Sequence, residues 1–75
     1  MPVFRFSPNS LRARRKALGL SREVVALRAR RGYETIRAYE QGVTVPPGDV
    51  IGRLAAALEC SPNDLYVKTE AEAAA

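Results

Sequence analysis

The feature that most constrains this chain is a pair of short helical patterns that follow each other almost without a linker. Ser21 suits the N-cap of the first helix, because its hydroxyl can accept a hydrogen bond from the free backbone N–H groups of the first turn. Gly32 offers a place to turn, since glycine tolerates backbone conformations that other residues avoid. The second pattern places Ile36 and Tyr39 on one helix face and ends at Gly42, a residue suited to the position just past a helix. Two consecutive short helices with a tight turn between them are therefore predicted.

Basic residues are concentrated in the same half of the chain. Residues 1–40 contain ten Lys and Arg against three Glu, whereas residues 41–75 contain two basic residues against five acidic ones. This asymmetry would orient the molecule toward a polyanion. Two short helices with a tight turn and many arginines are typical of a helix-turn-helix that binds DNA. The alternative explanation of the charge alone is that the arginines only keep the helices soluble.

A set of residues at fixed spacings extends across and beyond the helix pair. Its members are Arg15, Gly19-Leu20-Ser21, Val25-Ala26, Thr35-Ile36, Tyr39-Glu40, Gly42 and Pro46. This set resembles the helix-turn-helix pattern of the phage-repressor/Cro superfamily of XRE-like regulators, which runs R-x-x-x-G-L-[ST]-x-x-x-L-A, then T-[IV]-x-x-[WY]-E-x-G, then P. The resemblance needs no gap from Arg15 to Leu65, so it covers most of the chain.

The turn between the two helices departs from the family pattern. The family usually has glycine at the position of Arg30 and an apolar residue at the position of Arg31, and both are arginine here. We therefore expect a longer or shifted turn in which Gly32 takes over the role of the missing glycine. The recognition helix then spans about residues 32–41.

The resemblance implies an all-α fold, a compact five-helix lambda-repressor-like DNA-binding domain with the helix-turn-helix at helices 2 and 3. Capping signals and apolar spacing predict the helices at residues 8–18, 21–30, 32–41, 49–58 and 61–66. The predicted domain covers residues 7–67, after an N-terminal arm at residues 1–6 and before a disordered acidic tail at residues 68–75. Alternating residues in the arm fit either a short strand or an arm that packs Phe4 and Phe6 onto the domain. Such an arm could form a dimer contact with its counterpart or insert Arg5 into the DNA minor groove, and the remaining alternative is a loosely ordered terminus pinned by Phe6.

Exposed residues at the start of a recognition helix can reach base edges in the major groove. The candidate base contacts are Tyr33, Glu34, Arg37 and Ala38. Arg37 can donate two hydrogen bonds to guanine, and Ala38 can contact a thymine methyl group. Glu34 can accept from cytosine N4 or, in the interpretation we favour, stabilise the N-terminus of its own helix.

Four further arginines are candidate phosphate contacts: Arg22, Arg28, Arg30 and Arg31. Arg22 lies at the positive N-terminal end of helix 2, where an anion is favoured. The other three crowd the turn, and a nearby phosphate backbone would relieve their mutual repulsion. The alternative is that they point into water, where salt screens them.

Two structural roles follow from the family resemblance. In the family, the residues that match Arg15 and Glu40 form an ion pair. A guanidinium held by both oxygens of a carboxylate would lock helix 1 against the end of helix 3. The family also commonly forms its two-fold contact near the residues that match Leu65, Tyr66 and Val67.

The sequence offers little catalytic chemistry. It contains no histidine and one cysteine, Cys60, which excludes His-based catalytic or metal sites and an internal disulfide. We predict no enzyme activity, no cofactor and no metal. No apolar run is long enough to span a membrane.

These observations together predict a cytoplasmic, nucleoid-associated regulator that binds double-stranded DNA sequence-specifically, resembles a repressor and acts as a homodimer. The alternative is a protein-interaction module, antitoxin-like or an adaptor, whose helix-turn-helix is a scaffold for a protein partner.

Overall fold

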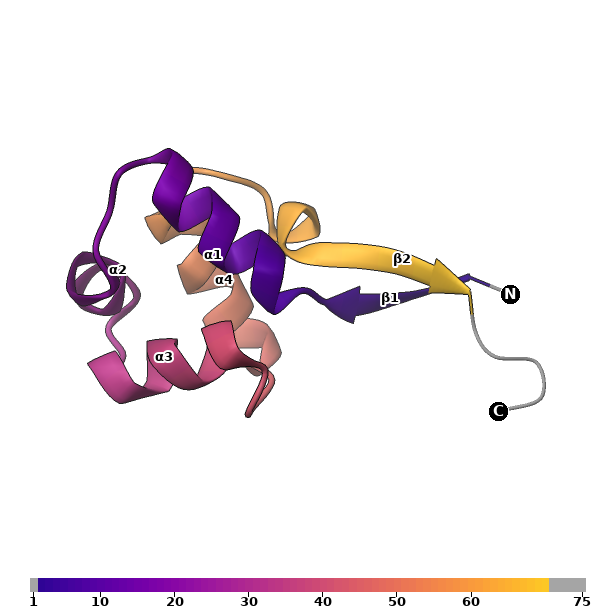
Figure 1. Ribbon diagram of the computed structural model, residues 1–75, viewed down its shortest axis with the longest axis horizontal. Helices are drawn as coiled ribbons and strands as arrows, with labels where there is room; N and C mark the ends of the chain where they lie inside the picture. The colour runs from indigo at the N-terminus through magenta and orange to yellow at the C-terminus, as the bar shows by residue number, and fades with distance from the viewer. Residues whose placement is uncertain (1, 71–75) are drawn as a thin grey trace.

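The computed structural model describes residues 2–70 of the chain, which form a helical body and a two-stranded antiparallel sheet (Figure 1). The elements in chain order are β1 Pro2–Phe6, α1 Pro8–Ala17, α2 Arg22–Ala29, α3 Tyr33–Gln41, α4 Gly48–Ala57, the 3₁₀ turn η1 Pro62–Leu65 and β2 Tyr66–Glu70. The predicted bounds of the first four helices are right to within one residue at each end. The prediction of five helices in an all-α fold is wrong, because the described residues contain four α-helices and a sheet.

The predicted fifth helix is a single 3₁₀ turn that leads into a strand. Its N-cap signals are real: Ser61 Oγ accepts a hydrogen bond from Asn63 N at 3.2 Å, and Ser61 N donates to Asp64 Oδ2 at 2.9 Å. The residues after Leu65 are aromatic or β-branched in part, which favours a strand. Residues 68–70 therefore end β2 instead of starting a disordered tail, and the predicted disorder of residues 71–75 lies outside the described residues.

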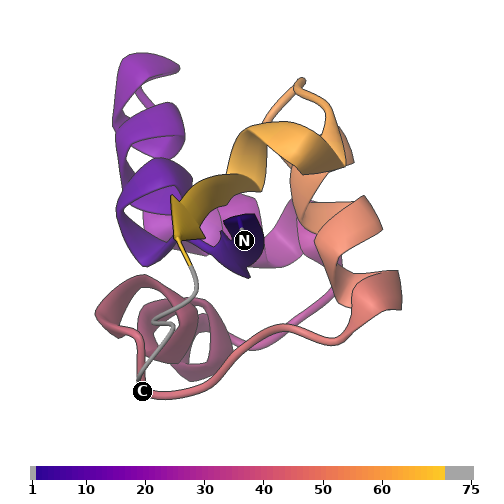
Figure 2. The same ribbon diagram turned by 90° about the vertical axis from the view of Figure 1, so that its right-hand side faces the viewer.

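The two strands form a ribbon that points away from the helices, as two perpendicular views show (Figures 1 and 2). Of the alternatives for the N-terminal arm, the structure has the strand. Phe4 pairs with Lys68 and Phe6 with Tyr66. The rings of Phe6 and Tyr66 meet edge to face with centroids 6.5 Å apart, and Phe6 packs against the core at the base of the ribbon.

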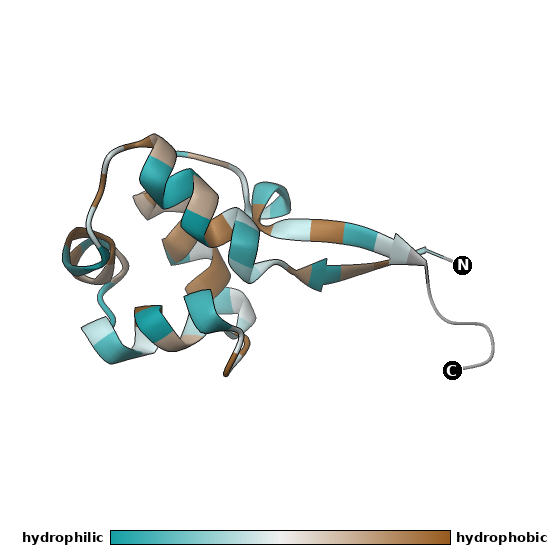
Figure 3. Ribbon diagram, viewed as in Figure 1, coloured by the Kyte–Doolittle hydropathy of each residue, from teal (hydrophilic) through white to brown (hydrophobic). Residues whose placement is uncertain are grey.

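The core lies where the four helices and η1 meet. Each of these elements contributes at least one fully buried side chain, namely Leu11, Val25, Ile36, Leu54 and Leu65. The most hydrophobic helix, α4, lies in the middle of the body behind α1 (Figure 3). Tyr39 is also buried, as its spacing from Ile36 predicts. This packing uses one face of α3 and leaves the other to solvent.

The turn between α2 and α3 consists of residues 30–32, within the three to four residues typical of a helix-turn-helix. Arg30 itself adopts the left-handed conformation, with φ 56° and ψ 45°, whereas Gly32 is extended with φ −72° and ψ 156°. Backbone hydrogen bonds from Arg30 N to Leu27 O and from Arg31 N to Ala26 O close the end of α2. The expectation that Gly32 replaces the missing glycine is therefore wrong. Arg30 takes that position at the steric cost of a Cβ in left-handed backbone, about 1–2 kcal/mol.

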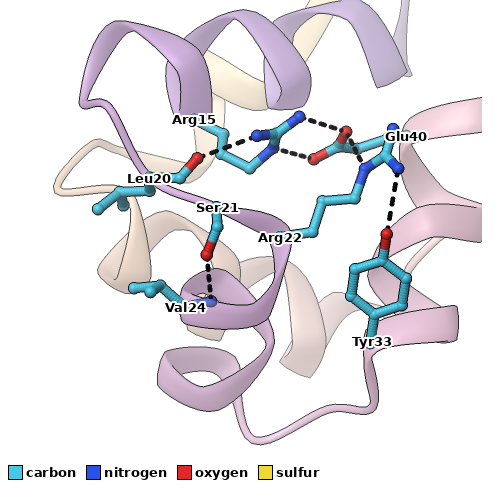
Figure 4. A network of polar contacts seen from close by, with 7 residues as sticks. All are labelled: Arg15, Leu20, Ser21, Arg22, Val24, Tyr33 and Glu40. Atoms are coloured by element: carbon cyan, nitrogen blue, oxygen red, sulfur yellow. Dashed lines mark hydrogen bonds and ion pairs between the residues drawn. The ribbon is translucent and has the colours of Figure 1, made fainter.

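A buried ion pair joins α1 to α3 (Figure 4). Arg15 donates from Nε to Glu40 Oε2 at 2.6 Å and from Nη2 to Oε1 at 3.0 Å, while its Nη1 donates to Leu20 O at 2.9 Å. The Glu40 side chain is 1% exposed. Burial raises the pKa of Glu40, but hydrogen bonds from Arg15 and Arg22 outweigh it and hold that pKa below the ordinary 4.5. The carboxylate is therefore ionised and held in place at neutral pH.

We expect Arg30→Gly to raise the free energy of unfolding by about 1 kcal/mol, because glycine adopts the left-handed conformation without steric cost. Denaturant titration measures the change. As a matched control, Arg12→Gly removes an arginine from the interior of α1 and should lower stability by about 1 kcal/mol. Destabilisation by Arg30→Gly would show that the side chain of Arg30 matters more than its backbone.

We expect Glu40→Gln to lower the free energy of unfolding at pH 7 by about 3 kcal/mol or more, because it leaves buried Arg15 without its counter-charge. The lowered pKa of Glu40 means that its stabilisation is fully present above about pH 4.5 and is lost as pH falls through the folded-state pKa. The free energies of unfolding of wild type and Glu40→Gln should therefore converge as the pH is lowered from 7 to 3. The control is Glu34→Gln on the same helix, whose exposed carboxylate should change stability by about 0.5 kcal/mol at most. A constant difference between these two free energies over that pH range would contradict the assigned role of the Glu40 carboxylate.

Candidate nucleic-acid interface

Arg22 connects the buried ion pair to the molecular surface. It is the first residue of α2, and its Nε donates to Glu40 Oε1 at 3.1 Å. Its Nη1 reaches the hydroxyl of Tyr33, the first residue of α3, at 3.4 Å (Figure 4). The Tyr33 hydroxyl and, to a lesser extent, Glu40 raise the pKa of Arg22. The N-terminal ends of α2 and α3 are thereby linked at one place.

Two guanidinium groups share one carboxylate in this network. Arg15 and Arg22 both donate to Glu40, so the cluster carries one more positive charge than negative. The Arg22 side chain is 28% exposed and the Arg15 side chain 11%, which places the more accessible cation at the N-terminus of α2. Helix N-termini carry partial positive charge, so the site favours an anion.

The exposed face of α3 carries the predicted base contacts. Tyr33, Glu34 and Arg37 are exposed and Ala38 is half-buried, while Ile36 and Tyr39 face the core. Gly32 is the N-cap and supplies no side-chain hydrogen bond to the first turn. The structure therefore brings together Tyr33, Glu34, Arg37 and Ala38 on one helix, beside Arg22.

Arg37 and Glu34 contact each other on this face. Arg37 Nη1 lies 3.2 Å from Glu34 Oε1, across one turn of α3. Both side chains are largely exposed, and exposed pairs of this kind contribute roughly 0–1 kcal/mol. A better acceptor can therefore draw Arg37 away from Glu34 at little cost. Glu34 also lies in the first turn of α3, where a negative charge stabilises the helix.

The arginines near the turn do not form one group. Arg28 Nη1 donates to Ala57 O at 3.0 Å and lies 3.7 Å from Glu59 Oε2. Arg31 donates to Arg30 O at 2.8 Å and lies 3.9 Å from Asp49. Acidic neighbours from other parts of the chain partly balance Arg28 and Arg31, so their mutual repulsion does not by itself require a nearby phosphate.

Arg30 belongs to a different part of the surface from Arg22. With Arg28, Arg53 and Ala56 it lines an open cavity of about 260 Å³ between the end of α2 and α4. Sequence reasoning did not single out Arg53, because its approach to Arg28 depends on how α4 packs against α2. No local sequence signal could have found it.

Neither a metal cluster nor a membrane-spanning helix occurs among residues 2–70. That part of the chain has no cluster of three or more residues able to hold a metal ion, and none of its helices has the length and apolarity to cross a membrane. Burial, and then the charge of Asp64, raise the pKa of the Cys60 thiol, so it remains protonated at neutral pH.

The geometry can be compared with known proteins. A family model described as a helix-turn-helix domain matches residues 9–65. The restriction-modification controller protein C.AhdI from Aeromonas hydrophila has a similar structure, with a TM-score of 0.75 and 31% identity over 77% of this chain and 88% of that chain. The P22 c2 repressor in complex with synthetic operator 9T gives a TM-score of 0.76 and 30% identity over 81% of this chain and 92% of that one.

A solution structure of the DNA-binding domain of the P22 c2 repressor gives a TM-score of 0.78 and 30% identity, covering 81% of this chain and 80% of that one. No curated protein matches the chain. The family match covers more than half of the sequence, and the structural matches share the repressor-like arrangement of helices. The chain belongs to the helix-turn-helix family and is an XRE-like, phage-repressor-like DNA-binding regulator.

Proposed function

We propose that the protein is a sequence-specific regulator of transcription that binds double-stranded DNA as a dimer and acts as a repressor in the cytoplasm, on the nucleoid. The observation that carries this proposal is the exposed N-terminal half of α3, which presents Tyr33, Glu34 and Arg37 while Ile36 and Tyr39 anchor the helix in the core. A structural neighbour, the P22 c2 repressor, is bound to an operator, which supports the same partner here. Two copies of α3 would enter successive major grooves about 34 Å apart.

Arg22 sets the position of the domain on the DNA backbone. It combines the unbalanced positive charge of the Arg15–Glu40–Arg22 cluster with the N-terminus of α2, and both attract a phosphate. Its hydrogen bond to Tyr33 couples this phosphate contact to the first residue of the recognition helix. Anchoring at Arg22 therefore fixes where Tyr33 and the rest of α3 meet the bases.

Arg28, Arg30 and Arg31 are further phosphate contacts in this proposal. Arg30 has no hydrogen bond or ion pair from its side chain among the described residues and is the most available of the three. Arg28 and Arg31 would share their charge between a phosphate and the exposed carboxylates of Glu59 and Asp49. Exposed ion pairs are weak enough for this exchange.

Base recognition is assigned to Arg37, Ala38, Tyr33 and Glu34. Arg37 would leave Glu34 and donate two hydrogen bonds to guanine O6 and N7. Ala38 would contact a thymine methyl group, and Tyr33 would contact a neighbouring base. Glu34 stabilises the first turn of α3. Its negative charge also disfavours DNA sequences that place a hydrogen-bond acceptor of a base opposite its carboxylate.

A mobility-shift selection on pooled genomic fragments with excess competitor DNA tests the proposal. Enrichment of one palindromic site supports it. If no DNA sequence is enriched at moderate salt, the alternative of a protein-interaction module is favoured. In that case the ion pair with Glu34 already neutralises Arg37.

We expect Arg37→Ala to reduce discrimination between the selected operator and single-base variants by about 1–3 kcal/mol at one base pair, because the bidentate contact is lost. Competition binding with a panel of operators measures the loss. Arg12→Ala removes the same charge from the outer face of α1 and should leave the order of preference unchanged. Equal loss of affinity for every sequence in the Arg37→Ala panel would contradict a base contact.

We expect Arg22→Ala to weaken binding to all sequences by a similar factor and to reduce the log–log salt slope by about 1, because one phosphate contact is lost. Titrations at several salt concentrations measure the slope. Thermal unfolding of the variant must be checked in parallel, because Arg22 also contacts Glu40. An unchanged slope in a folded variant would remove Arg22 from the phosphate contacts.

A further inference from the structure

The β-ribbon has features that the DNA-binding surface does not explain. It consists of five residue pairs and points away from the helices, with its base anchored by Phe6 (Figures 1 and 2). Phe4, in the middle of β1, is 69% exposed. Isolated two-stranded sheets are marginally stable in water, and further strands or packing against a helix normally stabilise them. The ribbon is therefore suited to contact another sheet edge.

The free edge of β1 can be assigned atom by atom. Ser7 N donates to Leu65 O at 2.8 Å, one pair beyond Phe6 and Tyr66 in the same register. In an antiparallel ladder the hydrogen-bonded pairs alternate with non-hydrogen-bonded ones, so Arg5 and Val3 direct their backbone groups toward β2. The backbone N–H and C=O groups of Phe4 and Phe6, and the C=O of Pro2, face outward.

The position of proline agrees with this assignment. Proline has no N–H, and it is found in sheets at edges where that group would face solvent. Pro2 is one of the positions whose backbone faces outward, so its lack of an N–H group costs no hydrogen bond between β1 and β2. The outward-facing donors that remain are those of Phe4 and Phe6.

We propose that this edge of β1 pairs antiparallel with β1 of a second copy, across a two-fold axis at Phe4, to form a four-stranded sheet. Phe4 of each copy would then exchange both backbone hydrogen bonds with Phe4 of the other. Phe6 N–H would donate to the Pro2 carbonyl of the second copy, twice by symmetry. All outward-facing donors of β1 are satisfied in this arrangement. It rests on the dimeric state in the proposed function and assigns its interface.

Charge decides between the two edges of the ribbon. The equivalent two-fold pairing of β2 would place Lys68 directly opposite Lys68 of the second copy, and like charges in that position destabilise a sheet. Pairing of β1 places two phenylalanine rings side by side instead, which is favourable. A second copy of β1 is therefore the occupant that fits this edge.

The dimensions of the molecule are compatible with DNA binding by such a dimer. The domain is 41 Å long. A five-residue strand takes up about 16 Å of that length, which puts the two helical bodies about 40 Å apart, centre to centre. This separation is close to the spacing of roughly 34 Å between successive major grooves.

Engineered disulfides test the edge directly. In a hydrogen-bonded antiparallel pair the Cα atoms lie about 5.5 Å apart, within the range that a disulfide can bridge. We expect Phe4→Cys, in a Cys60→Ala background and without DNA, to form a covalent dimer in glutathione buffer about tenfold faster than Lys68→Cys does. The control is closely matched, because Lys68 pairs with Phe4 and is also exposed but lies on the other edge. Equal rates, a faster Lys68→Cys reaction, or no covalent dimer from either variant would overturn the proposal.

Sedimentation equilibrium without engineered cysteines gives a second measurement. We expect Phe4→Lys to raise the dimer dissociation constant about tenfold, and Lys68→Glu to change it by about twofold at most. A wild-type monomer at high concentration, or a dimer insensitive to Phe4→Lys, contradicts the proposal. Circular dichroism confirms that each variant is folded. Operator selectivity is measured separately, so a failed interface with intact selectivity removes the β1 pairing and leaves the DNA-binding function.

Discussion

The carboxylate of Glu40 is the interaction on which the arrangement of the helices depends. It comes from the last turn of α3, is buried, and accepts from Arg15 of α1 and Arg22 of α2. Three helices therefore meet at one charged group whose desolvation is tolerable only while both arginines stay in place. Any tilt of α3 would lengthen these hydrogen bonds, so the two arginines and Glu40 fix the angle of α3 relative to α1 and α2.

Much of this structure could be predicted from local sequence signals. The helix starts at Ser7 and Ser21 were predictable, because each hydroxyl accepts from a backbone N–H three residues later. The buried faces were predictable from apolar spacing, as the positions of Ile36 and Tyr39 show. The grouping of candidate base contacts on α3 has the same origin, because residues that avoid the core on a short helix share its opposite face.

The rest depended on contacts between distant segments. Arg28 was assigned to phosphate, yet it donates to Ala57 O, 29 residues away. Arg14 likewise donates to Leu58 O, 44 residues away, a contact that no local pattern indicates. The strand at residues 66–70 forms because β1 lies beside it, and a capping signal at Ser61 carries no information about the conformation one turn later. At Arg30, the demand for a tight turn outweighed the steric preference of the residue. At Arg30 and in residues 66–70, contacts with other parts of the chain overrode the local conformational preference.

The end of α4 is held by arginines from two other helices through its main chain. Arg14 donates to Leu58 O and Glu59 O, and Arg28 donates to Ala57 O. These acceptors are peptide carbonyls, which every amino acid provides. The side chains on the outer face of α4 can therefore diverge during evolution without loosening the attachment of the end of this helix to α1 and α2.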